Sequence, residues 1–479
     1  MLFNSVAYAI FFLFVALLYY RIPWRQRWAL LLFSSCVFYM WLIPAYLLIL
    51  VFLILVDYFA AFGIHKAKGS ARKRWLTVSL VVNIGILCVF KYYDFLAINV
   101  HTLLSSIGIQ TELIKFRWEL PIGLSFHTFQ AMSYTIEVYK GRQEPERHFG
   151  IYSVYVLFFP QLVAGPIERP QNLLHQFHEE QKFNHAQVVS GLRLIGLGLF
   201  KKVVVADRLA EIADPVFTSA SFNGPGTAIG VLAFSIQIYC DFSGYSDIAV
   251  GSGRILGIKM MENFRRPYFA SNIQEFWKRW HISLSTWFKD YLYIPLGGSR
   301  ASTTRVACNI MLVFAVSGLW HGADWAFIIW GVTHGIFNVV SYLRRRYTRL
   351  DHRDCGLRYA FGVATTFGLV SLTWIWFRAG NYEQSLAIYN QLFSDWSIAS
   401  FSQIKTQFDN HSVRIDGIAI VAFSSLIVIA IDWFLEKAPL DQWLDSLSQF
   451  QRWALYYSAF AYFLLFGSDG LEQFIYFQF

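Results

Sequence analysis

Two histidines in one apolar stretch are the residues best suited to chemistry. In SGLWHGADWAFIIWGVTHG, residues 317–335, His321 stands between a tryptophan and a glycine, and His334 follows 13 positions later. A neutral imidazole in a pocket from which tryptophan rings exclude water can act as a general base toward an alcohol. On one straight helix the two histidines would point about 140° apart, so they share a face only if residues 322–324 break the helix. The alternative interpretation of His321 is an ordinary packing histidine.

A pair of aspartates forms a second candidate site. In the stretch QIYCDFSGYSDIAVG, Asp241 and Asp247 lie six residues apart. They could form an acid/base pair, bind a cation, or make ion pairs with Arg254 and the basic 251–305 segment. Because neither carboxylate should face lipid, we predict a helix break at Gly244.

Polar residues also follow one another at helical spacing in the 121–139 run. His127, Gln130, Tyr134 and Glu137 are spaced three, four and three apart. These spacings place them within about 80° of one helix face. The stripe should face the protein interior, either lining a cavity or forming a hydrogen-bond network between helices.

Common soluble-enzyme and metal-site patterns do not occur. The sequence has no GxSxG elbow, no Walker-type phosphate loop and no HExxH motif. His175 and His178 lie in a polar segment that is typical of a solvated face. The five cysteines have neither CxxC nor metal-type spacing. We therefore predict no disulfide, no structural zinc and no other metal site.

The composition indicates the kind of protein that must position these residues. Of 479 residues, 56% are hydrophobic, 19% aromatic and only 15% charged, whereas soluble domains have about a quarter charged residues. An ordinary soluble enzyme, a disordered chain and a disulfide-rich secreted domain are excluded. We predict a polytopic membrane protein whose net charge of +9 reflects basic loops on the cytoplasmic side rather than nucleic-acid binding.

Apolar runs of about 20 residues can cross a bilayer, and the shorter ones are expected to be re-entrant or broken. We expect ten to twelve true spans, the first of them a transmembrane helix rather than a signal peptide. The candidate runs are 5–20, 28–43, 46–64, 75–97, 121–139, 150–166, 187–206, 226–246, 306–320, 325–343, 359–377, 416–434 and 453–468.

Basic clusters predict the orientation of the chain. They comprise Arg21, Arg25 and Arg27, then Lys66, Lys68, Arg72, Lys73 and Arg74, then Arg344, Arg345, Arg346 and Arg349. If all three are cytoplasmic, the N-terminus faces outward. The topology between residues 167 and 305 is not predicted.

Residues 273–291 differ from an ordinary loop. Ile273, Phe276, Trp277, Trp280, Leu284, Trp287, Phe288 and Tyr291 recur at helical spacing with polar residues between them. This pattern predicts one amphipathic helix with an aromatic stripe, lying in the membrane interface or capping a helix bundle.

Seven motifs in register resemble the membrane-bound O-acyltransferase (MBOAT) family, specifically its bacterial branch with the alginate O-acetylation membrane protein. They are LPIGLSFHTFQAMSYTIEVYKG (120–141), FFPQLVAGPIERP (158–170), FKKVVVADRL (200–209), DFSGYSDIAVG (241–251), MENFRRPY (261–268), EFWKRWHISLSTWFKDYLYIPLGG (275–298) and GLWHGADWAFIIWG (318–331). Together with the flanking apolar runs, the resemblance covers nearly the whole chain.

The resemblance implies a fold and a set of site residues. It implies an all-α integral membrane protein in which about 10–12 tilted transmembrane helices, with re-entrant and amphipathic helices, surround a central tunnel. The chain would be a single membrane domain, 1–479, with N-terminal helices (1–115), a catalytic core (116–345) and C-terminal helices (346–479). The histidine of the WHG motif, His321 here, would be catalytic. Supporting roles are implied for His334, Asp241, Tyr245, Asp247, Asn272, Glu275, Arg279, Trp280 and His281.

The resulting hypothesis is an O-acyltransferase of the bacterial inner membrane, most simply an acetyltransferase. A cytoplasmic thioester, acetyl-CoA or an acylated carrier protein, would be the donor, with no bound cofactor. The acceptor would be an extracytoplasmic polysaccharide, an alginate-like exopolysaccharide or a cell-wall glycan, acylated directly or through a periplasmic or membrane-anchored partner protein. The alternative is an acyl-group transporter or channel subunit without chemistry of its own, although the repeated halves typical of transporters are absent from the sequence.

Overall fold

The computed structural model describes residues 1–41, 43–110, 112–113, 115, 118, 120–162, 165–219, 221–348, 356–413, 415–468 and 474–475. These residues form helices, turns and loops, with no β-strand among them. The all-α prediction is therefore confirmed. The chain divides into two compact units, 1–192 with 249–261, and 193–248 with 262–479, and each is described separately. The predicted subdivision at residues 115 and 345 stays a prediction.

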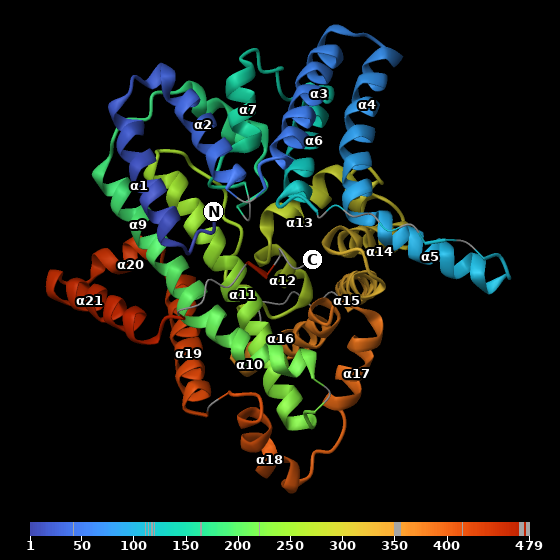
Figure 1. Cartoon of the computed structure of the whole chain (residues 1–479), viewed down its shortest axis with the longest axis vertical. Helices are drawn as coiled ribbons and strands as arrows, with labels where there is room; N and C mark the ends of the chain where they lie inside the picture. Colours follow the sequence, from blue (N-terminus) through green and yellow to red (C-terminus); the bar gives the residue numbers. More distant parts are fainter. Residues whose placement is uncertain are drawn as a thin grey trace. The chain divides into compact units, whose positions relative to one another are not determined.

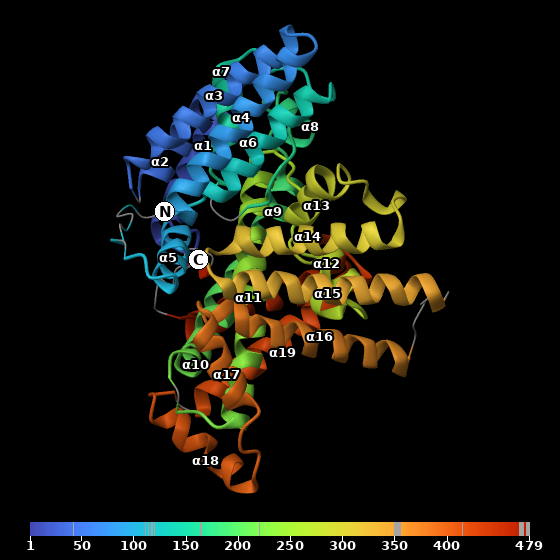
Figure 2. The ribbon, with the colours of Figure 1, turned by 90° about the vertical axis from the view of Figure 1, so that its right-hand side faces the viewer.

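The first unit consists mainly of the N-terminal helices. Helices α3 and α4 form a hairpin with α6 packed against both, as Figures 1 and 2 show. The helices are α1 (Val6–Arg21), α2 (Arg27–Met40), α3 (Tyr46–Lys66), α4 (Ser70–Leu87), α5 (Tyr93–Ser106), α6 (Leu124–Tyr139), α7 (Phe149–Leu157), α8 (Pro170–Leu173) and the first half of α9 (His185–Leu199).

The second unit contains the remaining helices. Figure 2 shows α14, α15 and α16 running side by side. The elements are the end of α9, a π-helical segment η4 (Phe200–Ala206), α10 (Asp207–Thr218), most of α11 (Gly224–Ile255), α12 (Ile273–Arg279), α13 (Ile282–Phe288), the π-helical η6 (Lys289–Tyr293), α14 (Thr303–His321), α15 (Trp325–Thr348), α16 (Leu357–Arg378), α17 (Tyr382–Leu392), α18 (Ile398–Asp409), α19 (Ile415–Lys437), α20 (Leu440–Ser446) and α21 (Gln449–Phe466).

Seven helices among the described residues are long and apolar enough to cross a membrane. They are Tyr46–Lys66, Ser70–Ser106, Gly224–Ile255, Thr303–His321, Trp325–Tyr347, Leu357–Arg378 and Gly417–Lys437. The second of these comprises α4 and α5, which the π-helical residues Cys88–Tyr92 join without a break. This number is below the ten to twelve expected because other apolar runs form shorter helices. Helix α1 has 16 residues, α2 has 14 and α6 has 16. The predicted orientation of the chain stays a prediction, and Arg349 of the third basic cluster lies outside the described residues.

The 150–166 run is not one straight helix. Helix α7 has nine residues and ends at Leu157, because Pro160 disfavours helical backbone just before it. Phe158 and Phe159 beyond its end remain buried. Irregular backbone in a membrane protein needs such protein surroundings, so this segment fits the expectation of broken elements.

The prediction of one amphipathic helix over 273–291 is wrong. Two short helices, α12 and α13, are separated at Trp280 and His281, and His281 has a left-handed backbone with φ of 43°. The loop at 263–265 satisfies the backbone at this break, since the amide of Arg265 donates to the carbonyl of Arg279 at 2.8 Å. Because these groups have partners outside the helix, the chain can turn and bury both aromatic side chains.

The prediction of a helix break at Gly244 is also wrong, because α11 is continuous from Gly224 to Ile255. The glycine serves close packing instead. A Cβ atom on Gly244 would lie 2.7 Å from the carbonyl oxygen of Gly198, and one on Gly198 would lie 2.6 Å from that of Gly244. These two glycines let the backbones of α9 and α11 approach each other, as small residues do between membrane helices.

Candidate active site

His321 is the last residue of α14, and the sequence after it ends one helix and begins the next. Gly322 has extended backbone, and α15 begins at Trp325. The carboxylate of Asp324 accepts a hydrogen bond from the amide of Ala326 at 2.8 Å, which caps the new helix. The condition under which His321 and His334 could meet, a break at residues 322–324, is therefore fulfilled.

Glycines hold α14 and α15 close together beside His321. A Cβ atom on Gly318 would lie 2.2 Å from the carbonyl oxygen of Phe327, and one on Gly331 would lie 2.3 Å from that of Phe314. A Cβ on Gly322 would overlap the ring of Phe327 at 2.1 Å. The glycine after the histidine is thus required by packing, and the hairpin is held rigidly where it carries His321.

Aromatic rings surround His321, which is 4% exposed. The centroid of its ring lies 4.9 Å from that of Trp320, 5.1 Å from that of Trp330 and 5.3 Å from that of Phe377. Trp330 also lies 4.9 Å from the ring of His334. The two histidines therefore pack against the same tryptophan.

The hydrogen bonds of His334 determine its protonation state. The hydroxyl of Thr373 donates to the carbonyl of Val370 at 2.7 Å, so its oxygen accepts from Nε2–H of His334 at 2.9 Å. The indole of Trp277 donates to Nδ1 of His334 at 3.3 Å. His334 is thus neutral, with one nitrogen donating and the other accepting. With both nitrogens engaged, this ring is suited to position its neighbours rather than to receive a proton.

His281 is held in the other tautomer. The side-chain oxygen of Asn263 accepts a hydrogen bond from the hydroxyl of Ser283 at 2.9 Å. The same oxygen lies 3.1 Å from Nδ1 of His281, and because an amide oxygen can only accept, this nitrogen must be the donor. Burial lowers the pKa of His281 to about 3, so the ring is neutral and its Nε2 carries the lone pair. The ring centroid lies 6.4 Å from that of Trp320, the residue before His321. Its left-handed backbone is a strain of the kind that collects at functional sites.

Trp280 joins the same aromatic cluster, which therefore contains four of the predicted residues: His321, His334, Trp280 and His281. The ring centroid of Trp280 lies 5.1 Å from that of Trp374, which lies 5.9 Å from that of Trp330.

The two aspartates of α11 form ion pairs, as one of the three interpretations proposed, and lysines are among their partners. Nζ of Lys202 lies 2.5 Å from Oδ1 of Asp241 and 2.7 Å from Oδ1 of Asp207. All three side chains are at most 3% exposed. Lys201 pairs with Asp247 at 2.9 Å. Arg254 donates a hydrogen bond to the hydroxyl of Ser190.

Tyr245 borders the same charged cluster, since Nζ of Lys202 lies 5.5 Å from the centroid of its ring. The π-helical segment η4 carries both lysines, a local distortion that is frequent at functional sites. The cluster neutralises buried charge, which fits a structural role for Asp241, Tyr245 and Asp247.

The remaining predicted residues lie in a separate network at α12. Asn272 caps the helix by accepting from the amide of Glu275 at 3.0 Å. Arg279 pairs with Glu275 at 2.7 Å and with Glu436 at 2.9 Å. These contacts support a structural role for the three residues. Within the described residues, no group of three or more His, Cys, Asp or Glu side chains could hold a metal ion.

The polar stripe of α6, in the first unit, forms a hydrogen-bond network, which is one of the two predicted alternatives. Nδ1 of His127 lies 3.1 Å from the carbonyl of Val156, and Gln130 donates to the carbonyl of Tyr155 at 2.5 Å. Tyr134 accepts from the amide of Glu146 at 2.8 Å. Glu137 accepts from Gln171 at 2.8 Å. The partners lie on α7, on the loop before it and on α8.

Sequence reasoning missed several residues around the histidines. Thr373, Trp374 and Phe377 come from α16, beyond the predicted core 116–345. Their apolar run resembles a lipid-facing helix, so its pattern gave no indication of these contacts. Asn263 and Lys202 stood in the quoted motifs MENFRRPY and FKKVVVADRL, where a polar residue beside buried positions was the available indication.

Comparisons with known proteins identify the class. Residues 76–377 match the MBOAT, membrane-bound O-acyltransferase, family. The chain is 38% identical over 412 residues to the probable alginate O-acetylase AlgI of Azotobacter vinelandii, covering 84% of this chain and 80% of the relative. It is 39% identical over 386 residues to the peptidoglycan O-acetyltransferase of Helicobacter pylori, covering 75% and 72%. A more distant relative, the teichoic acid D-alanyltransferase of Streptococcus thermophilus, is 30% identical over 287 residues, covering 53% and 68%.

The chain therefore belongs to the membrane-bound O-acyltransferase family. It is an O-acyltransferase and a multi-pass membrane protein. The resemblance inferred from the motifs is confirmed. The matched range, 76–377, contains every predicted site residue as well as the aromatic residues of α16.

Proposed function

We propose that this protein transfers an acetyl group from a thioester donor to a hydroxyl acceptor, with His321 as the general base. The observation that supports it best is the position of His321, at a glycine-tightened helix end inside an aromatic pocket. The names of two relatives, an O-acetylase and an O-acetyltransferase, support acetyl as the group transferred.

In the proposed reaction the acceptor O–H gives its proton to a ring nitrogen of His321 while its oxygen attacks the thioester carbonyl carbon. The tetrahedral intermediate then collapses, the carbon–sulfur bond breaks and an ester forms. The imidazolium of His321 returns the proton to the departing thiolate. His321 is neutral again, and donor and acceptor have exchanged one acetyl group for one hydrogen.

The neighbouring histidines would act as positioning residues. His334 has both nitrogens engaged, and its ring packs against Trp330, which also packs against His321. His281 borders Trp320 with a neutral ring. Together they hold the two tryptophans that flank the base, which keeps water from competing with the acceptor.

We infer the following substrates and location for this reaction. The donor is cytoplasmic, acetyl-CoA or an acetylated carrier protein, and its anionic character suits the basic loops. The acceptor is a hydroxyl of an extracytoplasmic polysaccharide, alginate-like or a cell-wall glycan, or a hydroxyl of a partner protein that passes the group onward. The protein then acts in the bacterial inner membrane. The relatives named for alginate and peptidoglycan support polysaccharide as the acceptor class.

The test is transfer by the purified protein in vesicles, with labelled acetyl thioester and a soluble hydroxyl acceptor. His321→Ala should lose nearly all transfer while its abundance and thermal unfolding stay normal. A matched control is His65→Ala, since His65 is a half-exposed histidine of the other unit, and this variant should remain active. Full activity of His321→Ala would exclude the proposed base. Saturable uptake of the acetyl donor without transfer would instead favour a transporter.

A further inference from the structure

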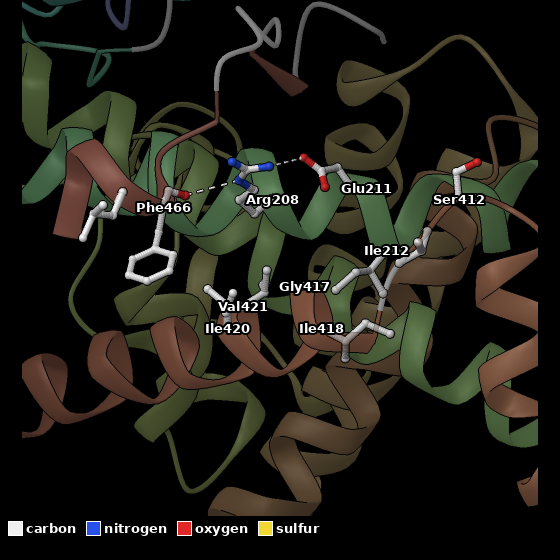
Figure 3. A pocket seen from close by; sticks show the side chains of 11 residues that line it. Arg208, Glu211, Ile212, Ser412, Gly417, Ile418, Ile420, Val421 and Phe466 are labelled. Atoms are coloured by element: carbon white, nitrogen blue, oxygen red, sulfur yellow. Dashed lines mark hydrogen bonds and ion pairs between the residues drawn. The ribbon is translucent and has the colours of Figure 1, made fainter.

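A cavity of about 380 Å³ lies in the second unit, and none of the predicted site residues lines it (Figure 3). Its walls come from α10, α19, the loop before α19 and the end of α21. This volume is in the range of small-molecule and lipid sites.

The lining of the cavity is divided between polar and apolar residues. Figure 3 shows Arg208 and Glu211 of α10 on one side and Ile418, Ile420 and Val421 of α19 on the other. An occupant must therefore have a charged part and a hydrocarbon part.

The charged side carries both signs. Nη1 of Arg208 lies 3.1 Å from Oε1 of Glu211, and the same guanidinium donates to the carbonyls of Phe466 and Gly467 at 3.2 and 2.8 Å. Three of its five N–H groups are thus engaged by partners among the described residues. Two N–H groups remain for an acceptor, and the second carboxylate oxygen of Glu211 remains for a donor. A simple anion would be repelled by Glu211 and a simple cation by Arg208, so a zwitterion fits this pair best.

The apolar side lies at one end of a helix that is long and apolar enough to cross a membrane. The α19 residues of the cavity belong to the beginning of the membrane span Gly417–Lys437. Ile420 and Leu465 are exposed large apolar residues at its edge. A boundary position is where phospholipid headgroups and the first methylene groups of their chains lie.

We propose that this cavity binds a zwitterionic phospholipid with a primary ammonium headgroup. Its phosphate accepts from Arg208, its ammonium donates to the carboxylate of Glu211, and one acyl chain lies along Ile418 and Val421. The site is separate from the acyl-transfer chemistry, so the proposal stands whether or not the proposed function does.

The test is competition among lipids for the full-length protein in detergent, with bound lipid measured by native mass spectrometry. Phosphatidylethanolamine should bind at least about five-fold more tightly than phosphatidylcholine, whose quaternary ammonium has no N–H, and than phosphatidylglycerol, which has no ammonium. Glu211→Gln should bring the ratio of phosphatidylethanolamine to phosphatidylcholine close to one.

Two bulky variants control for the place of binding. Ile418→Trp should fill the cavity and reduce binding of phosphatidylethanolamine several-fold. Leu312→Trp adds the same ring at an exposed apolar position of α14, away from the cavity, and should leave binding unchanged. Equal affinity for the three lipids, a preference that survives Glu211→Gln, or binding that is insensitive to Ile418→Trp would each overturn the proposal.

Discussion

The stripe of α6 and the pocket around His321 both bury a histidine in a membrane protein, yet their surroundings differ. His127 is 3% exposed and His321 is 4% exposed, so burial does not distinguish them. His127 bonds to a backbone carbonyl, and the next polar residue of the stripe, Gln130, does the same. His321 packs among three aromatic rings at the end of a helix.

Under the proposed function, this difference separates a structural histidine, His127, from the proposed base, His321. A backbone carbonyl fixes the tautomer of His127 and ties α6 to the chain beside it, which stabilises the fold. Aromatic walls around His321 keep water away from the imidazole, which suits the general-base role proposed for it. His334 lies among the same rings, and both of its nitrogens have hydrogen-bond partners, which suits the positioning role proposed for it.

The largest predicted effect comes from changing each histidine to glutamine. A glutamine amide can donate and accept hydrogen bonds as a neutral imidazole does, but it cannot take up a proton. His321→Gln should therefore lower kcat about a thousand-fold, or about 4 kcal/mol in the barrier. His334→Gln should retain activity within about ten-fold, and His127→Gln within about two-fold, in the labelled-acetyl transfer assay.

Two outcomes would break the distinction between base and positioning residue. If His334→Gln lost as much kcat as His321→Gln, with normal unfolding temperature, His334 would also carry a proton. If His321→Gln kept its activity, hydrogen bonding alone would explain the pocket. All three variants make the same change from histidine to glutamine. A difference in kcat between them therefore reports the position of the histidine and not the kind of substitution.

The sequence alone predicted the class of fold and indicated a candidate site at His321 because both depend on local patterns. Apolar runs predicted helices such as α3, α15 and α19, and the polar stripe of α6 predicted an inward face. The glycine and aspartate after His321 indicated that a break was possible. Each of these predictions needs only neighbours within a few turns.

The wrong predictions depended on distant partners. Gly244 resembled a helix breaker, but its role is the approach to Gly198, 46 positions earlier in the chain. The break at His281 is satisfied by Asn263 and its loop. Trp374 and Phe377 occur in a run that is typical of a lipid-facing helix. No local spacing reveals such contacts.

A smaller effect will show whether the charged cluster of α11 has a structural role or takes part in the chemistry. Lys202→Met leaves Asp207 and Asp241 buried without their cation and should destabilise the protein by about 3–4 kcal/mol. The expected readout is a lower unfolding temperature and less folded protein in detergent, with normal kcat in the fraction that remains folded.

The neighbouring lysine is the matched control. Lys201 pairs with Asp247, whose side chain is 24% exposed, so Lys201→Met should destabilise less because water can solvate this carboxylate. A kcat loss in folded Lys202→Met protein would instead place the cluster with His321, as part of the chemistry.

The smallest effect concerns Tyr134 of α6 and Tyr152 of α7, whose rings lie 4.5 Å apart. The hydroxyl of Tyr134 accepts from the amide of Glu146 at 2.8 Å. The hydroxyl of Tyr152 is buried with no hydrogen-bond partner among the described residues. Tyr134→Phe should cost about 1 kcal/mol because an amide loses its acceptor, whereas Tyr152→Phe should be neutral or slightly stabilising.

Both changes remove one oxygen from neighbouring buried rings, so packing loss is nearly the same and the difference reports the hydrogen bond itself. Unfolding of the two variants in the same detergent measures it, and acyl transfer should be unchanged in both. Equal destabilisation would mean that Tyr152 has a partner such as a bound water, and the α6 region would then be wetter than its contacts indicate. A loss of transfer in Tyr134→Phe alone would contradict the purely structural role of the stripe, because a hydroxyl that only holds a loop has no reason to alter kcat.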